Sequence, residues 1–232
     1  MPAKLVLFDI DGTILLTSGA GRRAMIAAIS EEVDLPDGSR QIRFDGKTDP
    51  QIVSELLASA GEPVPPSPAR VAAICRRYVE LLTEELSRPT TRTTVMPGVH
   101  SLLDRLESEA GIVLGLLTGN VAGGASLKLQ SAGIDPARFR VGAFGSDAAD
   151  RPALPPIAVE RAAPLFGGGL TGDQVVIIGD TPADIACGEC INARAVAVAT
   201  GGYTISDLRT CRPYAVFEDL SDTDGVMRSI LD

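Results

Sequence analysis

The segment Lys4–Thr13 constrains the fold of this chain more than any other part of its sequence. It starts as a run of apolar and β-prone residues and ends in two carboxylates, Asp9 and Asp11, followed by Gly12. Such a run is typical of a buried strand in a parallel sheet, and ligands of open α/β sheets bind beyond the carboxyl ends of the strands. Gly12 predicts a turn that lets both carboxylates face one pocket. A surface turn that happens to hold two Asp is the alternative, but a buried strand rarely delivers two carboxylates without a cation.

Two further apolar runs, residues 112–117 and 174–178, also end in polar side chains. The residues concerned are Thr118, Gly119, Asn120, Asp180 and Asp184. Because the carboxyl ends of parallel strands share one edge of a sheet, we expect all these groups to converge with the first pair. Several carboxylates at one point require a cation, and oxygen-only ligands favour Mg²⁺. A hydroxyl and free N–H groups at a helix N-terminus suit a phosphate oxygen, so the pattern predicts phosphoryl transfer.

Predicted strands and helices alternate along most of the chain, which indicates α/β architecture with a Rossmann-like parallel sheet covered on both faces. After the first strand, we predict strands at 112–117, 140–144, 174–178, 194–199 and 214–217, and helices at 99–110, 121–131, 155–165, 183–190 and the C-terminus. Helical patterns at 20–33, 51–60 and 69–86 interrupt this alternation. We therefore predict a core domain of residues 1–16 and 96–232 and an inserted helical domain of residues 17–95.

Composition excludes several classes of partner. The 232 residues carry a net charge of −9 and no basic cluster longer than two Arg, so nucleic acid is not an expected partner. No apolar run approaches the roughly 18–20 residues of a membrane span, and the N-terminus lacks the apolar region of a signal peptide. We expect a cytoplasmic protein, and the four Cys fit reduced thiols. Cys187 and Cys190 form a CxxC without a second CxxC or a nearby His, which favours core-facing positions on a helix over a zinc site or redox pair.

Three motifs of the chain resemble those of the haloacid dehalogenase superfamily. They are Asp9-Ile10-Asp11-Gly12-Thr13, Thr118-Gly119-Asn120 and Gly179-Asp180-Thr181-Pro182-Ala183-Asp184, in the order of the family's motifs I, II and IV. The helical insert is similar to the type 1 cap of the phosphoglycolate phosphatase and β-phosphoglucomutase branch. The resemblance implies a cap that opens and closes over the site, with hinges near residues 15–19 and 88–97.

The same resemblance implies a role for each strand-end residue. Asp9 is expected to be the nucleophile that forms an aspartyl-phosphate, and Asp11 the acid that protonates the leaving oxygen and then activates water. Asp9, the backbone carbonyl of Asp11 and Asp180 would hold Mg²⁺, with Asp184 as a supporting or water-mediated ligand. The phosphoryl oxygens would be bound by the second motif, Thr118, Gly119 and Asn120.

Motif III of the family needs a cation for the phosphate, usually a Lys followed by Pro. The matching stretch here begins Asp150-Arg151-Pro152, so Arg151 is assigned by position. Arg binds phosphate with two donors but is not equivalent to Lys. Lys128, which we expect on a helix surface, and Arg161 are the alternatives.

In this branch of the family a loop of the cap contacts the substrate, and residues 44–49 are the candidate. Lys47 could reach an anionic group of the substrate, or it could be a solvent-facing Lys beside a helix start. Arg22 and Arg23 lie near the predicted hinge, and one of them could face the cleft.

The leading hypothesis is a Mg²⁺-dependent phosphatase acting on a small phosphorylated metabolite, as a monomer or homodimer. A phosphomutase of the β-phosphoglucomutase type is the alternative. A 2-haloacid dehalogenase is disfavoured because that chemistry needs neither Mg²⁺ nor Asp11. A non-catalytic regulatory module is disfavoured by the intact carboxylates at the strand ends.

Overall fold

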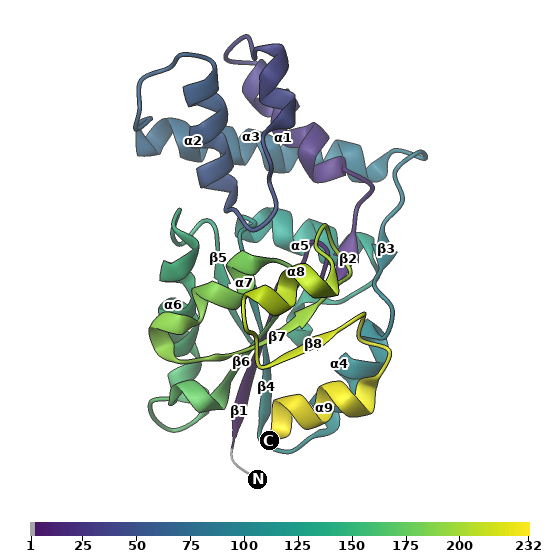
Figure 1. The fold of residues 1–232 in the computed structure, drawn as a ribbon. Coiled ribbons are helices and arrows are strands. Elements are labelled where there is room, and N and C mark those ends of the chain that lie inside the picture. Colours follow the sequence, from purple (N-terminus) through teal and green to yellow (C-terminus); the bar gives the residue numbers. More distant parts are fainter. Residues whose placement is uncertain (1–2) are drawn as a thin grey trace.

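The computed structural model describes residues 3–232, apart from the side chain of Arg40. An α/β layer forms one half of the molecule and a helical layer lies over one end of it (Figure 1). β1 begins and α9 ends at the opposite end of the α/β layer, so the helical layer faces the carboxyl ends of the strands (Figure 1).

The sheet has six strands in the order β5-β4-β1-β6-β7-β8, and every neighbouring pair is parallel, which confirms the predicted fold class. The strands are β1 Lys4–Phe8, β4 Ile112–Thr118, β5 Val141–Phe144, β6 Val175–Gly179, β7 Arg194–Val198 and β8 Ala215–Phe217. Phe8 at the end of β1 pairs with Leu116 of β4 and Ile178 of β6. This register places the three motif-bearing strand ends side by side.

Both faces of the sheet are buried, as the apolar runs predict. In β1, Val6 and Phe8 join one hydrophobic cluster, and Leu5 and Leu7 join the cluster on the other face. Helices α4, α5 and α9 pack on the first face and α6, α7 and α8 on the second. These helices are α4 Val99–Ser108, α5 Ala122–Ser131, α6 Leu154–Ala162, α7 Pro182–Cys187, α8 Ile205–Thr210 and α9 Thr223–Leu231.

The helical layer contains α1 Ala20–Ser30, α2 Asp49–Ser59 and α3 Pro68–Ser87, and we call residues 17–95 the cap. Its helices share their own hydrophobic cluster, in which Tyr78 and Leu56 are fully buried. Two short antiparallel strands, β2 Leu15–Leu16 and β3 Thr94–Val95, lead into and out of the cap. Val121 of the core joins the cap's cluster. The division into a core domain of residues 1–16 and 96–232 and a cap domain of residues 17–95 stays a prediction.

Several local expectations need correction. The short elements α8, β2 and β3 were not predicted, because two to six residues carry little periodic signal. The helix expected over 183–190 ends at Cys187, and a 3₁₀ turn, Glu189–Ile191, continues the chain. Cys187 is buried and Cys190 exposed, and all four cysteines are free thiols. None of the described helices is both long and apolar enough to cross a membrane.

Candidate active site

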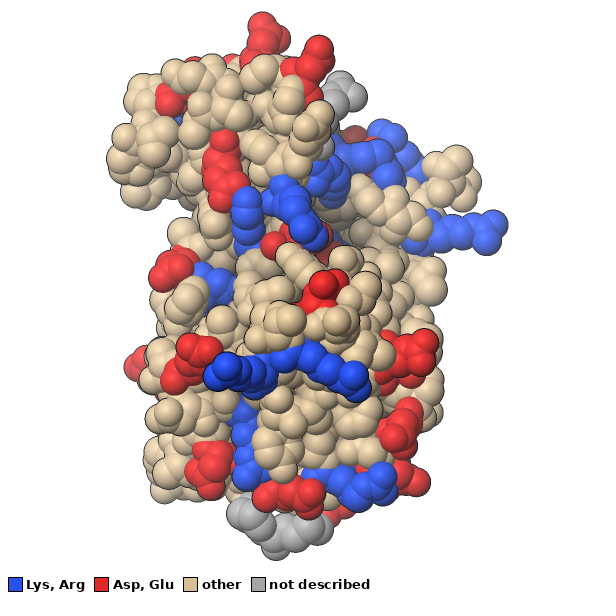
Figure 2. All heavy atoms as spheres, viewed as in Figure 1, with Lys and Arg blue, Asp and Glu red and all other residues tan. Residues whose placement is uncertain are grey.

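A cavity of about 240 Å³ lies between the cap and the carboxyl ends of β1, β4 and β6. Its walls include Asp9, Asp11, Thr118 and Arg151 from the core and Arg22 and Lys47 from the cap. Figure 2 shows basic side chains gathered along the seam between the two layers, with acidic atoms visible within it. The three sequence motifs therefore meet beneath the cap.

Three buried carboxylates lie close together at this end of the sheet, and two of them, Asp9 and Asp180, line the cavity. Asp9 follows β1, Asp180 follows β6 and Asp184 lies in the first turn of α7, and one oxygen of each lies within 4.8 Å of the others. Burial raises the pKa of Asp9 and of Asp180 above the ordinary range, and repulsion from Asp184 raises both further. Such a cluster is stabilised by a cation bound among its oxygens.

The donor set fits Mg²⁺, which prefers oxygen ligands. Asp180 is tightly held: Thr13 Oγ1 donates to its Oδ1 at 3.2 Å, and a methyl group at Gly12 or Gly201 would clash with its carboxylate. The carboxylate of Asp11 is not part of the cluster. The metal ligand expected from Asp11 is therefore its backbone carbonyl and not its carboxylate.

Asp184 is differently placed from the other two carboxylates. Its Oδ2 accepts hydrogen bonds from the backbone N–H of Thr181 at 2.9 Å and from the Thr181 hydroxyl at 2.6 Å. Its Oδ1 accepts from Arg151. Because both oxygens already have donors, Asp184 suits a supporting or water-mediated position more than direct coordination.

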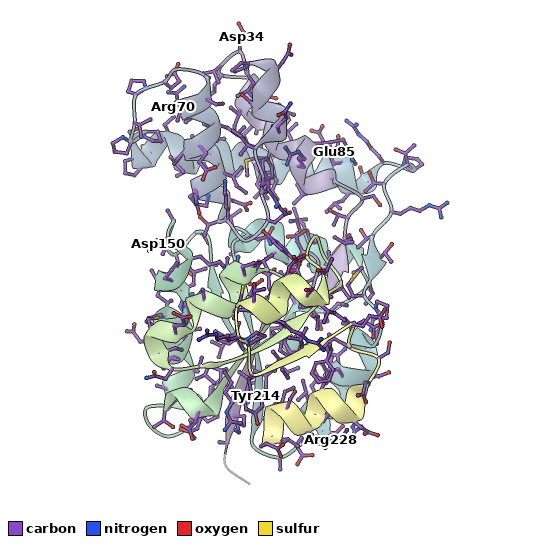
Figure 3. All side chains as sticks on the ribbon, viewed as in Figure 1. Asp34, Arg70, Glu85, Asp150, Tyr214 and Arg228 are labelled. Carbon is purple, nitrogen blue, oxygen red and sulfur yellow. The ribbon has the colours of Figure 1, made fainter. Side chains whose placement is uncertain are left out.

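Arg151 lies beside the expected nucleophile. Its Nη2 is 3.2 Å from Oδ1 of Asp9, and only 5% of the residue is exposed. Its buried Nε has no hydrogen-bond acceptor among the described residues. Asp150, labelled in Figure 3, marks the loop that carries Arg151 directly beneath the cap. Arg161 instead pairs with Asp147 on the surface and is not among the residues that line the cavity.

The expectation of a surface Lys128 is wrong: the residue is 4% exposed and lines the cavity. Its Nζ donates to Asp11 Oδ2 and to Asn120 Oδ1, each at 2.6 Å. The error arises because α5 packs against α3 of the cap, so a helix face that would be solvated on the core alone is covered. Helical periodicity alone therefore cannot predict that Lys128 faces the cavity.

The second motif is an interlocked loop at the start of α5. Thr118 Oγ1 accepts from the Asn120 side chain at 2.8 Å, and the Thr118 hydroxyl offsets a small part of the rise that burial causes in the pKa of Asp9. A methyl group on Gly119 would clash with the backbone carbonyl of Lys47, so this glycine permits the cap loop to approach. The loop residues thus position both the nucleophile and the cap.

Asp49 of the cap is a site residue that sequence reasoning did not single out beyond its place at a helix start. Its Oδ2 accepts from the backbone N–H of Val121 at 2.8 Å, and its own N–H donates to Gly119 O at 2.8 Å. Burial raises the pKa of Asp49 to about 6. Thr48, which caps α2 as predicted, donates its hydroxyl to Ala149 O at 2.6 Å. These bonds join the cap to the core.

The predicted cap residues have partners of their own. Lys47 forms an ion pair with Glu55, and both Lys47 and Arg22 line the cavity. The Arg22 guanidinium lies 4.3 Å from the centre of the Phe44 ring and donates to Ile42 O. Arg23 instead pairs with Glu85, labelled in Figure 3, away from the cavity.

The family model described as haloacid dehalogenase-like hydrolase matches residues 6–198. The chain belongs to this family. As a haloacid dehalogenase-like hydrolase it is an enzyme that acts on phosphate esters.

The hydrolase is similar over almost its whole length to several known proteins. It is 29% identical over 220 residues to a phosphoglycolate phosphatase of Rhodospirillum rubrum, covering 94% of this chain and 88% of that protein. A hydrolase structure from Pseudomonas syringae superposes with a TM-score of 0.74 at 20% identity, covering 99% of this chain and 100% of that one. A β-phosphoglucomutase from Clostridium difficile gives a TM-score of 0.73 at 16% identity, with 99% and 97% covered.

The raised pKa values make a prediction about Mg²⁺ and stability. Because the pKa values of Asp9 and Asp180 are higher in the folded than in the unfolded chain, the stability of the metal-free protein falls as pH rises from about 4 through the raised values. Mg²⁺ competes with protons for these oxygens, so its stabilising effect should grow with pH. At one fixed concentration, about 100 times its Kd at pH 8, Mg²⁺ should raise Tm by roughly 5–10 °C at pH 8 and by clearly less at pH 5.5, where protons weaken its binding.

Calorimetry in Mg²⁺ and in EDTA at both pH values measures this effect. The variant D180N is the control, and it should lose most of the shift at pH 8. An equal shift at the two pH values would show that the acidic cluster does not take up the ion.

Proposed function

We propose that this hydrolase is a Mg²⁺-dependent phosphatase that cleaves a small phosphomonoester through an aspartyl-phosphate on Asp9. The observation that carries the proposal is the pairing of a buried Asp9 with Arg151, whose Nε has no acceptor among the described residues, inside one cavity. A phosphoryl group placed there would meet a nucleophile and a cationic donor together.

In the first half-reaction, an oxygen of Asp9 forms a bond to phosphorus as the bond from phosphorus to the substrate's ester oxygen breaks. Asp11 gives its proton to that oxygen, and the substrate leaves as an alcohol. Arg151 and the groups of Thr118, Gly119 and Asn120 hold the phosphoryl oxygens. Bound Mg²⁺ would be held by Asp9, the Asp11 carbonyl and Asp180, supported by Asp184, and would offset the negative charge of the phosphoryl group.

In the second half-reaction, the Asp11 carboxylate takes a proton from water. The water oxygen bonds to phosphorus, and the bond between Asp9 and phosphorus breaks, which releases inorganic phosphate. Asp9 is again a carboxylate and Asp11 is again protonated. Each residue therefore returns to its starting form.

The volume of the cavity, about 240 Å³, supports a small substrate, and the phosphoglycolate phosphatase relative supports phosphoglycolate or a similar short phosphorylated acid. Lys47 and Arg22 line the cap side of the cavity and are the proposed contacts for the rest of the substrate. The hydrogen bonds of Thr48 and Asp49 join the cap to the core, and we propose that the cap opens for substrate to enter, with hinges near residues 15–19 and 88–97.

The proposed setting is the cytoplasm, which the four free thiols favour, with the enzyme acting as a monomer or homodimer. A phosphomutase shares the same core chemistry and differs in returning the phosphoryl group to the sugar instead of passing it to water. The likeness to β-phosphoglucomutase is one of fold, so the mutase stays the alternative.

The experiment is a phosphate-release screen over phosphoglycolate, sugar phosphates and nucleotides, run with Mg²⁺ and with EDTA. Hydrolysis of one or a few small phosphomonoesters that requires Mg²⁺ is the expected result. Isomerisation of a sugar phosphate without phosphate release, measured on the same samples, would identify a mutase. Absence of both activities would overturn the proposed function.

A further inference from the structure

Lys128 is a buried lysine that the proposed mechanism does not use. It projects from α5 into the cavity, and its side chain is 6% exposed. Helix α1 of the cap leaves room for it at Gly21, where a methyl group would lie 3.2 Å from Nζ. The ammonium group is thus enclosed between a core helix and a cap helix, and such burial is unfavourable unless the charge is well paired.

The partners of Lys128 converge on one atom. Its Nζ donates to Oδ2 of Asp11 at 2.6 Å, and the Asn120 side-chain amide donates to the same Oδ2 at 2.8 Å. Lys128 also donates to Asn120 Oδ1 at 2.6 Å. Thr118 accepts the amide of Asn120 in turn, so this triangle is anchored to the phosphate-binding loop.

A carboxyl oxygen that accepts from both an ammonium and an amide cannot also carry a proton without placing two donors face to face. Oδ1 of Asp11 accepts no hydrogen bond from the described residues, and 41% of the Asp11 side chain is exposed. The oxygen left to exchange a proton is therefore Oδ1. We propose that Lys128 is a positioning residue that, with Asn120, holds Asp11 so that Oδ1 serves the ester oxygen and the water; this inference rests on the proposed phosphatase function.

An anion-binding role for Lys128 fits the surroundings less well. Asp49 of the cap lies close enough to interact electrostatically with Lys128, and Asp11 contacts it directly. Two carboxylates around one ammonium leave the group with a net negative charge. An anionic part of the substrate would be repelled by this charge.

The test compares K128M, which keeps the length of the side chain and removes its charge, with wild type on two kinds of phosphomonoester. One is an alkyl phosphate, whose alkoxide must be protonated as it leaves; the other is p-nitrophenyl phosphate, whose leaving group departs without a proton. The parameter kcat/KM covers the steps up to formation of the aspartyl-phosphate, so the shared second half-reaction does not mask the difference. We expect kcat/KM to fall about 10²-fold or more for the alkyl ester and only a few-fold for the aryl ester.

K128Q, whose amide can still donate to Oδ2, should lie between wild type and K128M. Because Asp11 is partly exposed, water can solvate it after Lys128 is removed, and both variants should fold. K4M is the matched control: Lys4 is also buried, at 3% exposure, but lies at the far end of β1 and donates to Asp173 O. Its kcat/KM should stay near wild type on both substrates.

The results distinguish three possible roles of Lys128: positioning Asp11, supporting the structure and binding an anion. Equal decreases of kcat/KM on the two esters would show that Lys128 has only a structural role. A change confined to a higher KM and weaker inhibition by inorganic phosphate would show that Lys128 binds an anion. Either result overturns the inference. A wild-type enzyme that releases phosphate from neither ester would overturn the proposed function itself.

Discussion

Replacing Asp9 by Asn should lower kcat by about 10⁴-fold or more, because the amide of Asn is a far weaker nucleophile than the carboxylate that is proposed to bond to phosphorus. The carboxylate is buried, and its raised pKa means that its charge is held at a cost to stability near neutral pH. A neutral isostere removes that cost, so D9N in EDTA should unfold at or above the temperature of the wild-type protein.

Phosphate release and thermal unfolding, measured on the same preparation, check both parts of this prediction. The matched control is D34N, the same change at an exposed position in the cap, labelled in Figure 3, which should alter neither measurement. If D9N kept its turnover, the assignment of Asp9 as the nucleophile would be wrong. A collapse of Tm would show that the carboxylate mainly supports the fold.

Replacing Arg151 by Met should have the second-largest effect, and on two properties at once. Removing the donor beside Asp9 should lower kcat/KM by roughly 10²- to 10³-fold. It also leaves Asp9 and Asp184 buried without their common cation, which costs about 3–5 kcal/mol of folding free energy in the metal-free protein. Saturating Mg²⁺ should restore part of the stability, since it supplies positive charge to the same oxygens, but not the activity.

The variant R151K tests whether the positive charge at position 151 is sufficient for activity, since Lys is the usual residue of motif III. Lys keeps the positive charge but lacks the planar guanidinium and its fixed pair of donors. R151K should therefore recover only part of the kcat/KM that R151M loses. R161M, at an arginine that pairs with Asp147 on the surface, should retain near wild-type values. Full activity in R151M would show that another cation holds the phosphoryl group.

The sequence predicted the catalytic edge of the sheet well for a local reason. An apolar run that ends in Gly marks a strand end wherever it occurs, and parallel strands bring all such ends to one edge. Asp9, Thr118 and Asp180 therefore meet as expected, at the edge of a sheet whose parallel pairing follows from the alternation of strands and helices. Short elements such as α8 lacked enough residues to show a period.

The cap side of the cavity was decided by tertiary structure. The burial of Lys128, the bond from Val121 to Asp49 and the choice of Arg22 over Arg23 as a lining residue all depend on how the cap lies on α5. The bond from Val121 to Asp49 joins residues 72 positions apart in the chain, and no local period encodes it. The sequence by itself determined which end of the sheet carries phosphoryl chemistry, because strand ends are local; the packing of cap on core decided which charges reach it, because that packing is long-range.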